Sequence, residues 1–234
     1  PKERLEYLLD RILDEEGFLS EGGIRALSKY HENNPYSVTL DGHPYTIRYD
    51  PGDSTSDMFG GNSNWRGPVW MPINFLIIQS IRKYGEFYGD SLLVEFPKAS
   101  GSKINLCQVA DELTRRVISL FEKDAEGNRR CYGKYNWFYR QPGNEHLVLF
   151  YEYFHGDTGT GLGASHQTGW TALVAELISE YRSSPDKVRA FCKVCGSPIY
   201  SAKDDMPGVL RLRLGTVDTP FVCTDIFHIF TDSK

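Results

Sequence analysis

The chain has 234 residues and a formal net charge of −5, a balance that argues against a nucleic acid as its main partner. Hydrophobic residues make up 40% of the chain, enough for a core, but no apolar run approaches the length that crosses a bilayer, so no membrane partner is expected. Five cysteines at uneven spacing do not resemble a secreted disulfide framework, and no secretory leader precedes the first helical pattern. Both observations favour a cytoplasmic protein.

Apolar residues at helical spacing predict four amphipathic helices, joined by long loops rich in Gly, Pro, Asn and aromatic residues. The first ends by Gly17, and the second runs from Trp70 to about Tyr84. The four apolar stripes are Leu5, Leu8, Leu9 and Ile12; Trp70, Ile73, Ile77, Ile81 and Tyr84; Leu106, Val109, Leu113, Val117 and Leu120; and Trp170, Leu173, Val174, Leu177 and Tyr181. The pattern indicates a mainly α fold in this part of the chain.

The loop before the second helix has the composition of a sugar site. Between Phe59 and Asn74 it carries two tryptophans, an arginine and three asparagines. Flat aromatic rings stack on the C–H face of a sugar, while amide and guanidinium groups bind its hydroxyls. The alternative, which the residues leave open, is a tight loop whose tryptophans only belong to the core.

The acid Glu152 lies in the most aromatic part of the chain. Nine aromatic residues fall between Tyr132 and Phe154, and Tyr151 and Tyr153 flank the acid. Burial beside aromatic rings would raise the pKa of its carboxyl toward the range useful for proton transfer. An ion pair between Glu152 and an arginine, with no catalytic role, is equally compatible with the spacing.

A possible strand at 146–150, followed by glycines at 159, 161 and 163, imitates a dinucleotide-binding turn. The spacing is Gly-x-Gly-x-Gly instead of Gly-x-Gly-x-x-Gly, and no second strand with an acidic end follows the helix. A nucleotide cofactor is therefore not expected.

The pattern changes after about residue 179. Residues 179–186 read as a linker between a first domain, residues 1–178, and a second, residues 187–234. Beyond the linker, Leu210, Leu212 and Leu214 alternate with arginines as in a strand, and residues 227–230 could form another. Cys192 and Cys195 have the Cys-x-x-Cys spacing that lets two thiolates reach one zinc ion. Two ordinary thiols are the alternative.

Three stretches resemble glycoside hydrolase family 63, in the branch that includes mannosylglycerate and glucosylglycerate hydrolases and is related to processing α-glucosidase I. They are residues 17–31, residues 60–74 and residues 150–171. The resemblance covers about residues 1–178. It implies part of an (α/α)6 toroid with long aromatic loops and no cofactor. The substrate would be an α-linked glucoside or mannoside, or a small molecule like glucosylglycerate or mannosylglycerate.

The resemblance also implies roles for individual residues. Glu152 would be the general base of an inverting hydrolase. The residues lining the sugar subsite would be Trp65, Arg66, Gly67, Trp70, Asn74 and Trp170. Inversion also needs a general acid, which in the family is an aspartate upstream of the Trp-Arg-Gly motif. This stretch is lacking here, so we expect a fragment with no turnover of its own. A non-catalytic carbohydrate-binding module is the alternative.

Residues from about 180 to 234 look like the C-terminal half of the glutathione-dependent formaldehyde-activating enzyme family, whose domain centromere protein V shares. The resemblance rests on residues 183–200, 207–220 and 228–234. It implies a small, all-β tail that is part of a zinc fold, with Cys192 and Cys195 as metal ligands at an incomplete site. A zinc-dependent carbon–sulfur lyase relative is thus a third functional alternative.

Overall fold

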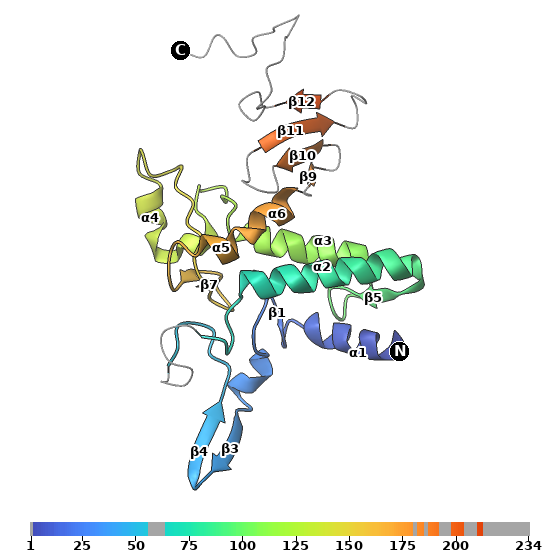
Figure 1. Cartoon of the computed structure of the whole chain (residues 1–234), viewed down its shortest axis with the longest axis vertical. Helices are drawn as coiled ribbons and strands as arrows, with labels where there is room; N and C mark the ends of the chain where they lie inside the picture. Colours follow the sequence, from blue (N-terminus) through green and yellow to red (C-terminus); the bar gives the residue numbers. More distant parts are fainter. Residues whose placement is uncertain are drawn as a thin grey trace, which may run out of the picture. The chain divides into compact units, whose positions relative to one another are not determined.

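The computed structural model describes residues 2–55, 64–179, 182–184, 187–191, 198–203 and 210–212. The chain divides into two compact units, residues 1–177 and residues 178–234. Figure 1 labels helices and strands of both units where there is room. The first unit combines helices with small antiparallel sheets, so it contains more strand than the mainly α fold predicted from sequence.

Two long helices form the core of the first unit. α2 (Met71–Tyr88) and α3 (Leu106–Ser119) lie side by side (Figure 1). The side chain of Asn105 accepts a hydrogen bond from the backbone N–H of Gln108, whose side chain accepts one from the backbone N–H of Asn105. This capping box begins α3. All five residues of the predicted apolar stripe of α3 are buried, which confirms that helix.

The buried face of α2 differs from the predicted one. Ile73 and Tyr84, expected in the core, are 39% and 47% exposed. The residues that α2 buries are Met71, Asn74, Ile78, Ile81 and Gly85. The cause is Asn74, whose amide binds the backbone of Ile24 and so turns that side of the helix inward.

The other helices are shorter than predicted. α1 (Lys2–Ile12) ends well before Gly17, with Leu8 exposed and Leu9 buried. The fourth predicted helix is interrupted, so that α5 (Thr168–Thr171) and α6 (Leu173–Ser179) replace it. The additional short helical segments are α4 (Asn136–Tyr139) and the 3-10 turns η1 (Lys29–Glu32), η2 (Gly89–Ser91) and η3 (Arg130–Tyr135). None of the helices in the described part of the chain has both the length and the apolarity to cross a bilayer.

Four two-stranded antiparallel sheets complete the described part of the first unit. They pair β1 (Leu19–Ser20) with β2 (Gly23–Ile24), β3 (Tyr36–Leu40) with β4 (His43–Ile47), β5 (Leu93–Glu95) with β6 (Lys103–Asn105), and β7 (Tyr153–Phe154) with β8 (Gly161–Leu162). Of residues 146–150, considered as a strand in the dinucleotide alternative, only Phe150 is paired, in an isolated bridge with His166. That alternative therefore lacks its first element.

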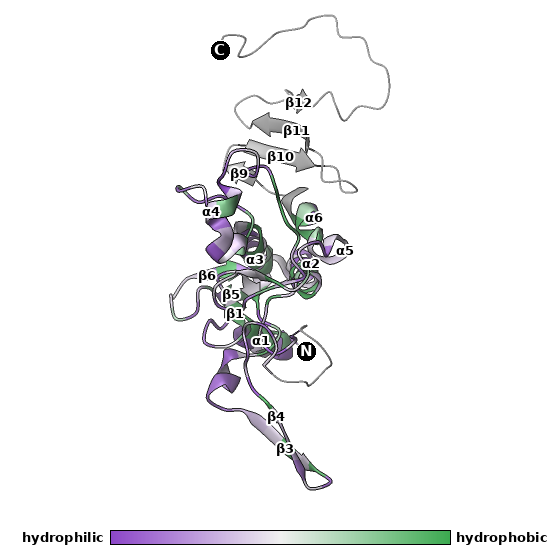
Figure 2. Ribbon diagram, turned by 90° about the vertical axis from the view of Figure 1, so that its left-hand side faces the viewer, coloured by the Kyte–Doolittle hydropathy of each residue, from purple (hydrophilic) through white to green (hydrophobic). Residues whose placement is uncertain are grey.

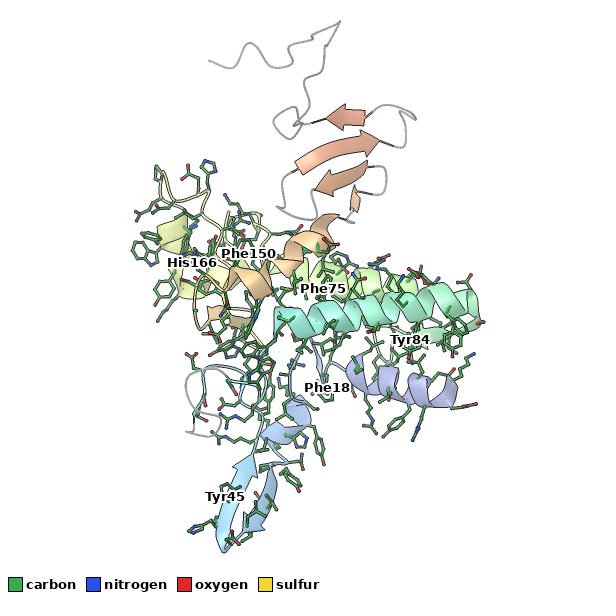
Figure 3. The ribbon with its side chains drawn as sticks, in the orientation of Figure 1. Phe18, Tyr45, Phe75, Tyr84, Phe150 and His166 are labelled. Carbon is green, nitrogen blue, oxygen red and sulfur yellow. The ribbon has the colours of Figure 1, made fainter. Side chains whose placement is uncertain are left out.

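The β3–β4 hairpin extends away from the rest of the unit, with Tyr45 on its second strand (Figure 3). Its turn residues Asp41 and Gly42 have φ values of 48° and 78°, as a type I′ hairpin turn requires. The register places Tyr36, Val38 and Leu40 opposite Ile47, Tyr45 and His43. Because side chains alternate along a strand, these six share one largely apolar face, and Figure 2 shows green and purple residues mixed along the hairpin.

The second unit contains a four-stranded antiparallel sheet in the order β12-β11-β10-β9. Its strands are β9 (Arg182–Ser184), β10 (Lys187–Phe191), β11 (Pro198–Lys203) and β12 (Leu210–Leu212). β9 falls within residues 179–186, where the sequence predicts a linker. The zinc ligands predicted at Cys192 and Cys195, and the strand predicted at 227–230, lie outside the described residues.

Replacing Gly85 with alanine should destabilise the first unit, because the added Cβ atom would lie 2.6 Å from the backbone nitrogen and from the sulfur of Cys107. Overpacking of this kind costs about 1–3 kcal/mol, which urea unfolding followed by circular dichroism would measure. Gly169→Ala is the matched control, since a Cβ atom on that helical glycine meets nothing within 4 Å. Equal unfolding midpoints for the two variants would contradict the close approach of α2 and α3.

Candidate functional site

One backbone pairing joins the tryptophan loop to the segment that carries Glu152. The N–H of Val69 donates to the carbonyl of Phe154 at 2.8 Å, and the N–H of Phe154 donates back at 2.9 Å. Val69 also pairs with Arg25, and the N–H of Ala26 donates to the carbonyl of Pro68 at 2.9 Å. Three segments that are distant in sequence therefore meet along extended backbone.

This pairing builds a cluster of four aromatic rings. Trp70 stacks on Trp65, with ring centroids 3.8 Å apart and planes at 4°, and on Tyr153, with centroids 4.8 Å apart. The ring of Trp170 lies against Trp70 at 5.7 Å in a tilted arrangement. Trp70 is 1% exposed, whereas Trp65 and Trp170 are 43% and 38% exposed. The cluster thus has a buried centre and two rings with accessible surface.

Asn64 and Arg66 brace the loop from inside. The Nδ2 of Asn64 donates to the carbonyls of Asp50 and Gly52 at 2.6 and 2.8 Å, and its Oδ1 accepts from the backbone N–H and the Nε of Arg66. The indole N–H of Trp70 donates to the carbonyl of Asn64 at 2.9 Å. Arg66 is buried, with Nη2 2.7 Å from the Oγ of Ser54 and 3.8 Å from the carboxylate of Asp50. The predicted arginine therefore holds the loop together.

Asn74 has a similar bracing position. Its buried amide accepts a hydrogen bond from the N–H of Ile24 at 2.7 Å and donates to the carbonyls of Ile24 and Trp70 at 3.0 Å. Gly67 is needed for a close approach, since a Cβ atom there would lie 2.7 Å from the carbonyl oxygen of Asp50. Both residues belong to the framework beneath the rings.

Glu152 lies at one edge of the ring cluster. Its backbone N–H donates to the carbonyl of Ala164 at 2.8 Å, and its Oε2 accepts from the N–H of Ala164 at 3.2 Å. A Cβ atom on Gly163 would lie 2.6 Å from that Oε2 and 2.9 Å from the Cε1 of Tyr153. The carboxylate and the tyrosine ring therefore border the same point of the 163–164 loop. Glu152 is partly exposed, so solvent reaches it.

A second carboxylate meets the same tyrosine. The hydroxyl of Tyr153 donates to the Oδ1 of Asp53 at 2.9 Å. Burial, together with the negative charges of Asp53 and Glu152, raises the pKa of the Tyr153 hydroxyl. Tyr153 therefore remains a protonated donor between two carboxylates.

Behind the pairing lies a polar network around Asp157. Its Oδ1 accepts from the Nη2 of Arg25 at 3.1 Å and from the hydroxyl of Tyr49 at 2.9 Å. Arg25 also donates to the carbonyls of Glu15, Gly17 and Leu19. This buried guanidinium ties the end of α1 and β1 to the turn that follows β7.

His155 closes that turn. Its Nδ1 accepts from the backbone N–H groups of Asp157 and Thr158 at 3.2 and 3.3 Å. Burial lowers the pKa of the imidazole, opposed by the carboxylates of Asp157, Asp50 and Asp53. The neutral ring is the form that can accept these two hydrogen bonds.

On the other side of Glu152 the chain pairs with the approach to α5. Phe150 and His166 form a parallel bridge and lie close together in Figure 3. The N–H of Gln167 donates to the carbonyl of Phe150 at 2.8 Å, and the hydroxyl of Thr171 donates to the carbonyl of Tyr151. These bonds anchor the short helix that carries Trp170.

The structure brings most of the predicted site residues together. Trp65, Trp70 and Trp170 form the cluster with Glu152 at its edge, while Arg66, Gly67 and Asn74 lie in the supporting framework. Asp53 and Tyr153 at the same cluster were not predicted. Asp53 has no motif around it, but the tyrosines beside Glu152 were visible in the sequence. Among the described residues, no group of three or more His, Cys, Asp or Glu could hold a metal ion.

Comparison with protein families assigns both parts of the chain. Residues 2–171 match the family described as mannosylglycerate hydrolase MGH1-like glycoside hydrolase domain. Residues 165–233 match the glutathione-dependent formaldehyde-activating enzyme. Both resemblances inferred from the sequence are thereby confirmed, and the two matches share residues 165–171.

Relatives from two yeasts match more than half of the chain. Uncharacterized protein YMR196W of Saccharomyces cerevisiae is 52% identical over 181 residues, which are 76% of this chain and 17% of that protein. Mannosyl-oligosaccharide glucosidase of the same yeast is 30% identical over 126 residues, 53% of this chain and 12% of that protein. The probable mannosyl-oligosaccharide glucosidase of Schizosaccharomyces pombe is 29% identical over 179 residues, 76% of this chain and 15% of that protein. The chain spans less than a fifth of each relative.

Replacing Asn74 with alanine should destabilise the first unit by about 2 kcal/mol or more, because the buried N–H and carbonyl of Ile24 would lose their partners. Urea unfolding followed by tryptophan fluorescence would measure the loss. Asn144→Ala is the control, since the amide of Asn144 donates to one carbonyl at an exposed position. A change no larger than that of the control would contradict the bracing role.

The lowered pKa of His155 predicts a pH-dependent stability. The unfolded imidazole, with a pKa near 6.5, binds a proton more readily than the folded one, so stability is present above that pH and is lost as the pH falls below it. Urea midpoints at pH 8 and pH 5.5 would show this loss. His155→Asn should reduce it, whereas His43→Asn on the exposed hairpin should leave it unchanged. An unaltered pH dependence in His155→Asn would contradict the assignment.

Proposed function

This chain belongs to the mannosylglycerate hydrolase MGH1-like glycoside hydrolase family, and from that membership we propose that its first unit is the base-bearing part of an inverting α-glycoside hydrolase. The observation that supports this most is the Val69–Phe154 pairing, which joins the tryptophan loop to the segment of Glu152. The first unit would be a section of an (α/α)6 toroid, with α2 and α3 as neighbouring helices of the ring.

Glu152 is the proposed general base. Its carboxylate is held by the N–H of Ala164 and is partly exposed, so it can accept a proton from a water molecule that attacks the anomeric carbon. In an inverting enzyme the base and the acid stand roughly 6.5–9.5 Å apart, which leaves room for that water. We propose that the acid comes from another part of a longer protein, so that this chain by itself binds sugar without hydrolysing it.

The proposed sugar surface is formed by the exposed parts of Trp65 and Trp170, whose rings both lie against the buried Trp70. An apolar sugar face would stack on these rings. Arg66, Gly67 and Asn74 would act indirectly by holding the loop. The substrate would be an α-linked glucoside or mannoside, or a glycerate glycoside. Two relatives named as mannosyl-oligosaccharide glucosidases favour a glucoside. Binding without turnover, as in a carbohydrate-binding module, needs only these rings.

For the second unit we propose a partial β domain of the formaldehyde-activating type. Its Cys192 and Cys195 would supply two thiolates to a zinc ion, which is half of the usual tetrahedral set. Two further ligands would have to come from elsewhere. A lyase activity through this unit is therefore a weaker proposal than sugar binding through the first.

Titration of the 234-residue chain with methyl α-glucoside and methyl α-mannoside, followed by tryptophan fluorescence, tests the proposal. We expect saturable quenching, and about tenfold weaker binding in Trp65→Ala because the stacking surface is lost. Trp137→Ala is the matched control, since Trp137 is also an exposed tryptophan but contacts Phe138 in α4. Equal affinity for the two variants would contradict the assignment of the surface.

The same titration with Glu152→Gln should show binding close to that of the unaltered chain, because the base acts on water. Release of glucose or mannose from the methyl glycosides by the isolated chain should be absent. Hydrolysis by this chain that disappears in Glu152→Gln would overturn the expectation that the acid comes from elsewhere.

A further inference from the structure

We propose that Asp53 is a specificity-determining residue of this sugar site, accepting a hydrogen bond from a sugar hydroxyl beside Glu152; the inference rests on the sugar-binding function proposed above. Neither the sequence motifs nor the family matches assign a role to Asp53. Four observations support the assignment: the fastening of its loop, the arrangement of its two oxygens, its tie to the ring cluster and its charge.

The loop that carries Asp53 is fastened on both sides of the residue. The carbonyls of Pro51 and Gly52 accept hydrogen bonds from the N–H of Gly156 and from Asn64. After Asp53, the Oγ of Ser54 accepts from Arg66, and the hydroxyl of Thr55 donates to Asp50 at 2.6 Å. The backbone at Asp53 is therefore held, although its side chain is exposed.

A hydrogen bond to one oxygen orients the carboxylate of Asp53, and the other oxygen is available to a ligand. Its Oδ1 accepts the hydroxyl of Tyr153 at 2.9 Å, while its Oδ2 has no hydrogen-bond partner among the described residues. A carboxylate has about four acceptor positions, so Asp53 retains capacity for further donors. An exposed acceptor whose direction is already set loses little conformational freedom when a hydroxyl binds.

Tyr153 connects this acceptor to the ring cluster. The same tyrosine ring stacks on Trp70 and borders the carboxylate of Glu152 next to Gly163. Asp53 therefore lies one hydrogen bond away from the ring that joins the stacking surface to the proposed base. A sugar on the tryptophans presents its hydroxyls around the edge of its ring, where an acceptor in this position can reach one of them.

The charge of Asp53 decides the chemistry of the group it can bind. Ionised carboxylates only accept hydrogen bonds, and bonds to a charged acceptor are roughly twice as strong as neutral ones. Asp53 and Glu152 place two carboxylates beside Tyr153. A hydroxyl of a neutral glycoside is a suitable donor, so recognition at Asp53 should depend on the presence of one particular hydroxyl.

The experiment combines variants of Asp53 with sugars that lack one hydroxyl. The full chain is titrated with the methyl glycoside it binds best and with the 2-, 3-, 4- and 6-deoxy analogues of that glycoside, followed by tryptophan fluorescence. Asp53→Ala should bind the parent glycoside about tenfold more weakly. One deoxy analogue, and only one, should bind to Asp53→Ala and to the unaltered chain with the same affinity, because it lacks the hydroxyl that Asp53 binds.

Asp53→Asn keeps an oxygen that can accept from Tyr153 but loses the charge, so it should weaken binding less and show the same deoxy dependence. It also tests the proposal if Asp53→Ala fails to fold, which circular dichroism would reveal. Asp111→Ala, at an exposed position on α3, should bind every sugar as the unaltered chain does.

The outcomes separate the two proposals. If the unaltered chain binds no glycoside, the sugar-binding function itself is wrong. If it binds and the Asp53 variants bind all analogues with unchanged affinity, only the role of Asp53 is wrong. The role of Asp53 would also be wrong if the Asp53 variants bound every analogue more weakly than the unaltered chain by the same factor. In that case the removal of no single hydroxyl would abolish the difference in affinity, which indicates a general disturbance of the site.

Discussion

Val69 and Phe154 exchange two backbone hydrogen bonds, and this pairing determines which side chains of two distant segments can meet. It aligns the loop before α2 with the segment of β7, so that the indole of Trp70 stacks on the ring of Tyr153. Arg25 joins from a third segment and satisfies several carbonyls with one buried guanidinium. Without this meeting of extended backbones, Glu152 and the tryptophans would belong to separate parts of the fold.

The helical periodicity of the sequence predicted α3 and an apolar stripe that is buried, because that helix is amphipathic, but it left out Ala110, Thr114 and Ile118, which the helix also buries. It placed α2 correctly but not its face, since the pattern contains no sign that Asn74 would bind the backbone of Ile24. The β3–β4 hairpin was missed, although apolar residues at alternate positions and the Asp41-Gly42 pair are a hairpin signal. Short sheets of two residues, such as β7–β8, leave no periodic pattern and arise from tertiary pairing.

The candidate site was predictable in composition and only partly in arrangement. Tryptophans, an arginine and an acid among aromatic residues predicted a carbohydrate site, and the match to a glycoside hydrolase family agrees with that prediction. Residue type did not distinguish the groups that face a sugar from those that hold the loop, because Asn64 binds buried carbonyls and Arg66 lies against a carboxylate as readily as either would bind sugar hydroxyls. The partnership of Asp53 with Tyr153 depends on how a loop closes, and no local pattern records it.

The β3–β4 hairpin has a consequence for the dynamics of the first unit. Every residue of its two strands except Ile47 is exposed, so little apolar burial opposes the separation of the strands. Local opening free energies are lowest where such contacts are few. The amide hydrogens of this hairpin should therefore exchange with solvent deuterium well before those of α2 and α3, through fraying that leaves the ring cluster intact.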